Sequence, residues 1–170
     1  MNKTSRTLSS IISLGILLLT LSGGVSASAS ELDSLGTSQG NRNEASSLTA
    51  EVNAAEQNND GTVAAVTWSI ENNGEDPVTL SWLFEGSYTY TGSFFSGVTA
   101  SAKDSGTRYH PFMDGVGECV CSGNIGSDFL NVLHAQTKLT YWSLYAIPEE
   151  TEMITIEIPG FEPIEDIPIS

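Results

Sequence analysis

Positive charge is scarce in this chain. The 170 residues include six Lys and Arg against 21 Asp and Glu, which gives a net charge of −15. Proteins that bind nucleic acid or anionic lipid need a positive patch, and no cluster of bases occurs after Arg6. The sequence therefore argues against a nucleic-acid partner, and we interpret the acidity as a means of keeping the protein soluble.

Recognisable catalytic motifs are also lacking. The sequence has no Gly-x-Ser-x-Gly elbow, no His-Glu-x-x-His pair, no phosphate-binding loop and no dinucleotide fingerprint. The two histidines, His110 and His134, are interpreted as structural or surface residues. The paired carboxylates near Pro148 and Pro168 are typical of solvated turns. We therefore predict that the protein is not an enzyme and needs no cofactor.

Long apolar runs are absent except near the start. There, an apolar stretch over residues 8–21 follows Lys3 and Arg6, and Ala27 and Ala29 fit the small-x-small pattern that a signal peptidase cleaves. Polar residues and a glycine interrupt the stretch, so it falls short of the roughly 20 apolar residues that span a bilayer. We predict a signal peptide over residues 1–29, a secreted or cell-surface location, and no membrane span after cleavage.

Cleavage after Ala29 leaves 141 residues, in which four bases face the 21 acids, a net charge of about −17. That length is enough for one domain with a hydrophobic core. Residues 30–47 are small and polar, which predicts a flexible linker. The folded domain is expected over residues 48–170.

Alternation of apolar and polar residues, the signature of a half-buried strand, recurs along that domain. Turn signals such as Asn58-Asn59-Asp60-Gly61 separate the alternating segments. Residues 127–135 are the best candidate for a short helical turn. We predict an all-β fold, an antiparallel sandwich of seven to eight strands. The expected strands are residues 48–54, 66–70, 78–84, 98–102, 107–112, 138–147, 153–158 and, as an eighth, 164–169.

The three tryptophans fall in expected strands. Trp68 and Trp82 are in phase with apolar neighbours, so both are predicted to lie in the core. Trp142 lies in a run where both strand faces carry large side chains. One face of that strand is therefore expected to be exposed.

Cysteine is limited to Cys119 and Cys121, with Val120 between them. In an exported protein the pair is expected to form a local disulfide, provided the chain bends to bring the Cα atoms within about 4.4–6.8 Å. Three alternatives stay open. They are a metal site with His110 or His134, a redox-active pair and intermolecular bonding.

Glycine, proline and the cysteine pair concentrate between residues 110 and 126. Because recognition residues are common on loops held by a rigid scaffold, this segment is our candidate binding loop. Its candidate contact residues are His110, Pro111, Asp114 and Glu118.

Three blocks carry a family resemblance. The stretch Thr67-Trp-Ser-Ile-Glu-Asn-Asn-Gly-Glu-Asp-Pro-Val resembles the opening of bacterial extracellular immunoglobulin-like domains. The cysteine block over residues 108–123 and the closing block over residues 158–169 are similar to those of secreted actinobacterial proteins. In such proteins the domain often precedes an OmpA-like peptidoglycan-binding domain. The likeness covers residues 48–169 and includes no counterpart of that second domain, so it implies an immunoglobulin-like fold without implying wall binding.

Together these observations predict a secreted, non-enzymatic binding or structural module of the cell surface or medium. Its partner would be an unidentified protein or a cell-wall component. The alternative is a metal-handling protein that uses Cys119 and Cys121 with a histidine.

Overall fold

The fold is all-β. The computed structural model describes residues 33–85, 88–103, 105–123 and 131–170. In these residues the chain forms ten strands and two 3-10 helices, and all strand pairings are antiparallel. The predicted all-β antiparallel sandwich is confirmed. The strands outnumber the seven to eight expected because Gly36–Gln39 and Val132–Leu133 also form strands, where a linker and a helical turn were expected.

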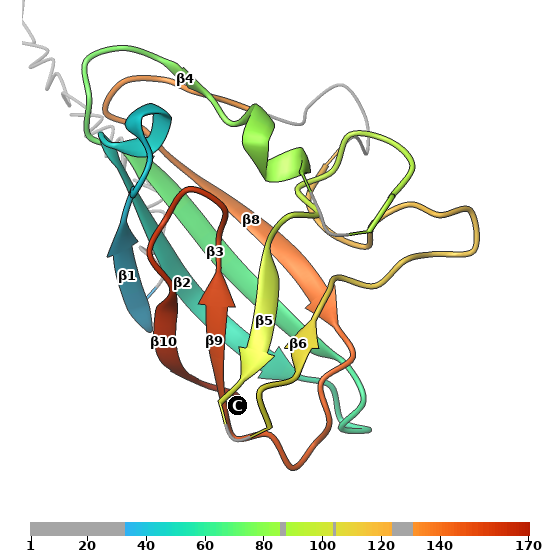
Figure 1. Ribbon diagram of the computed structural model, residues 1–170. Coiled ribbons are helices and arrows are strands. Elements are labelled where there is room, and N and C mark those ends of the chain that lie inside the picture. The colour runs from blue at the N-terminus through green and yellow to red at the C-terminus, as the bar shows by residue number, and fades with distance from the viewer. Residues whose placement is uncertain (1–32, 86–87, 104, 124–130) are drawn as a thin grey trace, which may run out of the picture. The chain divides into compact units, whose positions relative to one another are not determined.

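Two four-stranded sheets and one small ribbon make up the fold (Figure 1). The first sheet has the order β1-β2-β3-β8 and consists of β1 (Gly36–Gln39), β2 (Leu48–Gln57), β3 (Ala64–Asn72) and β8 (Lys138–Tyr145). The second has the order β10-β9-β5-β6 and consists of β10 (Ile164–Pro168), β9 (Met153–Glu157), β5 (Thr99–Ala102) and β6 (Arg108–Tyr109). The ribbon pairs β4 (Val78–Thr79) with β7 (Val132–Leu133).

The two sheets share one apolar core. Alternate residues of β2 and β3 point inward, and so do the isoleucines of β9 and β10, which is why the period-two pattern is visible in the sequence. Trp68 is fully buried, with its ring 4.8 Å from that of Tyr141 and 6.0 Å from that of Phe95. The prediction that Trp68 lies in the core is confirmed.

A buried hydrogen bond links the sheets inside this core. The Tyr145 hydroxyl on β8 donates to the carbonyl of Val98, which precedes β5, at 3.0 Å. Burial raises the pKa of Tyr145, so the phenol stays protonated and remains a donor. The polar group is thereby satisfied in a site that excludes water.

The predicted flexible linker over residues 30–47 is wrong in its described part. β1 pairs along its whole length with β2, and Asn43–Ala45 form a 3-10 helix with Ala45 fully buried. The segment has few apolar residues, which is why a linker was predicted, but its backbone hydrogen bonds to β2 hold it in an ordered strand. Gly36 allows this close packing, because a Cβ there would lie 2.7 Å from Cγ2 of Ile164 on β10.

Hydrogen bonds also join the two sheets along the β1 and β10 edges. Near one end, the Asn41 amide donates to the Gly160 carbonyl at 2.8 Å, and the Glu162 amide donates to the Gln39 carbonyl at 3.2 Å. At the other end, the Ser170 amide donates to the Ala55 carbonyl at 3.0 Å. This side of the sandwich therefore offers little open strand edge.

The expected strand over residues 78–84 ends at Thr79, and Ser81–Phe84 form a 3-10 helix instead. Leu80 and Leu83 are both fully buried, and their spacing of three matches one 3-10 turn. Trp82 was predicted to lie in the core, but it is only half-buried and packs against the core from outside. Its Nε1 donates to the Pro159 carbonyl at 2.9 Å. Its polar nitrogen thus keeps it at the margin of the core.

Two further expectations need correction. The helical turn expected over residues 127–135 falls partly outside the described residues, and its described part contains strand β7. The strand expected over residues 107–112 is regular only at β6, because the chain then turns away to pair with β8. Among the described residues, no helix has the length and apolar character needed to cross a membrane.

Replacing Trp68 tests the shared core. We expect Trp68→Ala to destabilise the protein by about 3–5 kcal/mol in urea unfolding, because it leaves a large cavity. Trp142→Ala is the matched control, since that ring lies on the outer face and is 38% exposed. If Trp142→Ala lowered the free energy of unfolding as much as Trp68→Ala does, the assignment of Trp68 to the inner face and Trp142 to the outer face would be contradicted.

Candidate functional site

The segment over residues 110–123 covers the outer edge of β8. After β6 the chain crosses to the first sheet, where the Phe112 amide donates to the Leu144 carbonyl at 2.9 Å. The returning strand of the loop bonds the same edge, with the Ser122 amide donating to the Trp142 carbonyl at 2.8 Å. The loop is therefore a docked part of the sandwich, and we call residues 110–123 the edge loop.

A disulfide lies in the returning strand of this loop. The Cα atoms of Cys119 and Cys121 are 5.3 Å apart and their sulfurs are at bonding distance, in keeping with the predicted local bridge. Both cysteines are buried against Phe94. Gly123 permits this packing, because a Cβ there would lie 2.3 Å from Cδ1 of Phe94.

The tip of the edge loop is held by a carboxylate. Oδ1 of Asp114 accepts hydrogen bonds from the amides of Val116 at 2.9 Å and Glu118 at 2.8 Å. Asp114, a predicted contact residue, therefore shapes the turn, while the side chain of Glu118 is exposed beside it. Val116, at the tip, is 74% exposed.

Beside the edge loop lies a hollow of about 490 Å³ with mostly apolar walls, which we call the aromatic hollow. The ring of Tyr88 meets that of His110 edge-on, with centroids 4.6 Å apart. The Tyr90 hydroxyl donates to the Pro111 carbonyl at 2.7 Å, which fixes one wall. The residues that define it are Tyr88, Tyr90, Tyr109, His110, Pro111 and Met113.

His110 is an uncharged member of this hollow near pH 7. Burial lowers its pKa, and the positive charge of Arg108 lowers it further. Its Nδ1 atom is buried and has no hydrogen-bond partner among the described residues. The hollow thus offers aromatic faces and a neutral imidazole, a surface suited to packing against apolar groups.

The structure brings two of the four predicted contact residues together. His110 and Pro111 line the hollow, whereas Asp114 and Glu118 lie on the turn outside its wall. Sequence reasoning missed Tyr88 and Tyr90, which belong to no strand and come from a distant part of the chain. The only signal in the sequence is the local cluster of tyrosines at positions 88 and 90, and it does not indicate contact with His110.

The alternative metal site finds no ligand set in the part of the chain that the structure describes. The two sulfurs are bonded to each other, and no group of three His, Cys, Asp or Glu side chains there is placed to hold an ion. His134 is exposed in the segment after β7.

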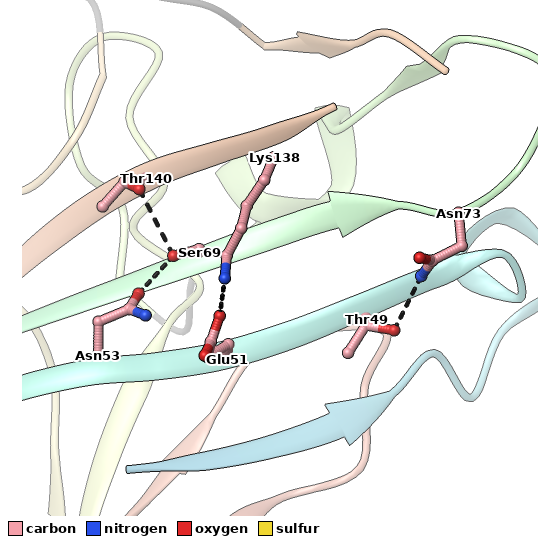
Figure 2. A network of polar contacts seen from close by, with 7 residues as sticks. All are labelled: Thr49, Glu51, Asn53, Ser69, Asn73, Lys138 and Thr140. Carbon is pink, nitrogen blue, oxygen red and sulfur yellow. Dashed lines mark hydrogen bonds and ion pairs between the residues drawn. The ribbon is translucent and has the colours of Figure 1, made fainter. Parts of the chain in front are cut away.

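A polar network crosses the outer face of the first sheet (Figure 2). Lys138 of β8 forms an ion pair with Glu51 of β2 across the intervening strand β3, beside Ser69. The Ser69 hydroxyl donates to the Asn53 amide oxygen and lies 3.5 Å from the hydroxyl of Thr140. Most of these side chains satisfy one another, so the network ties three strands together.

Glu51 is the one acid of this network, and it is buried. Burial by itself would raise its pKa, but the hydrogen bond and charge of Lys138, with hydrogen bonds from Ser34 and Asn53, outweigh that and lower it. A carboxyl whose pKa is lowered on folding stabilises the protein above its unfolded pKa, and this contribution is lost as the pH falls through the folded pKa.

Comparisons with protein-family models, with curated proteins and with solved structures each found no match to this chain. The resemblance to actinobacterial immunoglobulin-like domains therefore stays a prediction.

The pair of Glu51 and Lys138 generates a pH-dependent prediction. Glu51→Gln should destabilise the protein by about 1 kcal/mol at pH 7, because Lys138, which stays partly exposed to water, loses its charged partner. As the pH falls below the ordinary carboxyl pKa of 4.5, the difference from wild type should shrink. Urea unfolding at pH 7 and pH 3 measures both effects. Glu56→Gln, at an exposed position of the same strand, is the control. If Glu51→Gln had the same free energy of unfolding as the wild type at both pH values, the stabilising role of the pair would be refuted.

The disulfide generates a prediction on covalent state. Protein exported by its native host and denatured without reductant should take up no thiol-alkylating reagent, and should be about 2 Da lighter than its reduced form. Mass spectrometry before and after reduction measures both quantities. Two labelled thiols in unreduced material would contradict the disulfide and would leave both sulfurs free to bind a metal ion.

Proposed function

We propose that this protein is a secreted, non-enzymatic binding or structural module of the cell surface or medium, and that it contacts its partner through the aromatic hollow and the edge loop. The observation that carries the proposal is the exposure of large apolar side chains there. Tyr88 is 58% exposed and Met113 is 46% exposed at the hollow, and Val116 is 74% exposed at the tip of the edge loop. Clustered exposed apolar side chains commonly mark interaction sites.

The rigidity of the surface supports a binding role. The disulfide, the turn around Asp114 and the hydrogen bonds to β8 restrain the edge loop before any partner arrives. A restrained surface loses less conformational entropy on binding than a free loop does. The loop therefore has the properties of a preorganised recognition element.

Export and family are the other parts of the proposal. Export is supported by the pattern of residues 1–29 and by the cysteine pair, since disulfides persist in oxidising compartments. An immunoglobulin-like arrangement is supported by two antiparallel sheets that enclose one core. A protein or a cell-wall component remains the proposed partner.

The proposal is tested by binding to cells. Fluorescently labelled protein is incubated with cells of the native host, and retention after washing is measured. We expect Tyr88→Ser with Met113→Ser to reduce retention at least tenfold, because the change removes apolar contact from the hollow. Trp142→Ala, which alters an exposed ring on the sheet face, should bind like wild type. Equal retention of all three proteins would overturn the proposal.

A further inference from the structure

Tyr109, at the β6 edge of the second sheet, is shared by the linings of two hollows. It lines the aromatic hollow and also a second hollow of about 320 Å³ that lies toward the turn between β8 and β9. Tyr109 belongs to β6, the last strand of its sheet in the order β10-β9-β5-β6 (Figure 1). The two hollows are thus adjoining compartments with one shared aromatic wall.

The second hollow differs in chemistry from the first. Pro148 and Met153 contribute apolar surface to it, and Glu150 contributes a carboxylate. Glu150 is exposed and forms no ion pair with any residue that the structure describes. We call this compartment the acidic hollow, and its free carboxylate is available to a cation from outside.

The charge balance around both hollows favours a cationic partner. Arg108 is the base that lines the aromatic hollow, and Glu157 already neutralises it through an ion pair of 2.6 Å. The chain as a whole carries a net charge of −15. A basic partner is therefore attracted at long range, and it meets an unpaired carboxylate at short range.

We propose that the two hollows bind an extended peptide segment that carries an aromatic or large apolar residue and, nearby on the same side of the chain, Lys or Arg. The inference rests on the proposed function and deepens it by naming the partner's chemistry. In an extended chain, side chains two positions apart point the same way and lie about 7 Å apart. The apolar side chain enters the aromatic hollow, and the cation reaches Glu150 across Tyr109. A neutral saccharide would leave the carboxylate without a charged partner.

The test uses three synthetic peptides that differ only at the two anchor positions. Their cores are Trp-Ser-Lys, Trp-Ser-Glu and Ala-Ser-Lys, each flanked by serines and capped at both ends. Binding to the full mature protein is measured by the shifts of backbone amide resonances on titration. We expect Trp-Ser-Lys to bind at least tenfold more tightly than either other peptide, and to weaken when the salt is raised from 20 mM to 500 mM, where exposed charges are strongly screened.

Three variants assign the selectivity to the hollows. Glu150→Gln should abolish the protein's preference for Trp-Ser-Lys over Trp-Ser-Glu. Glu149, the neighbouring acid, lies outside the hollow lining, so Glu149→Gln should retain that preference. Tyr109→Ala should weaken Trp-Ser-Lys at least fivefold, because it removes the shared wall. Thermal unfolding of each variant confirms that the fold is intact.

The outcomes separate this inference from the proposed function. Equal binding of all three peptides, or a preference that survives Glu150→Gln, would overturn the basic-peptide inference. Binding of a trimer of N-acetylglucosamine in place of the peptides, with shifts at Tyr88 and His110, would overturn it while leaving a binding role for the hollow. Loss of the cell-retention difference in the double variant would instead overturn the proposed function itself.

Discussion

The docking of the edge loop onto β8 is the constraint on which the proposed contact surface depends. β8 is the last strand of the first sheet, and without the loop its backbone groups would lie open to pairing with another chain. Hydrogen bonds from Phe112 and Ser122 satisfy that edge. The same contacts fix where His110 and Pro111 lie, so one set of interactions closes the sheet and builds a wall of the aromatic hollow.

The core and the polar sheet face give this loop a rigid support. Trp68 and Tyr141 pack on the inner face of the first sheet, and the pair of Glu51 and Lys138 ties its outer face across three strands. Tyr145 adds a buried hydrogen bond between the sheets close to the place where the loop docks. A fixed scaffold of this kind is what the proposed recognition role of the loop requires.

Local pattern predicted the long strands well. The alternation around Val66, Trp68 and Ile70 identified β3, because the period of side chains in a strand is a local property. Strand β1 and the aromatic hollow were not predicted. β1 is held by backbone pairing and by the close approach of Gly36 to β10, and neither leaves a mark in composition. The aromatic hollow joins Tyr88 to His110 through tertiary packing, and no local pattern encodes that contact. The local bridge was predicted because Cys119 and Cys121 are the only two cysteines of a chain expected to be exported, and the chain bends enough to bring their Cα atoms within 5.3 Å.

The edge loop is docked on β8 and so presents a preformed surface. Amide hydrogen exchange of the oxidised protein tests it most directly, at the amides of Phe112, Val120 and Ser122, which all donate hydrogen bonds within this unit. We expect these amides to exchange slowly in the oxidised protein. After reduction of the disulfide they should exchange faster, while the amides of β2 and β3 stay protected. Rapid exchange of the three amides in the oxidised protein would show that the loop is free, and would contradict the account.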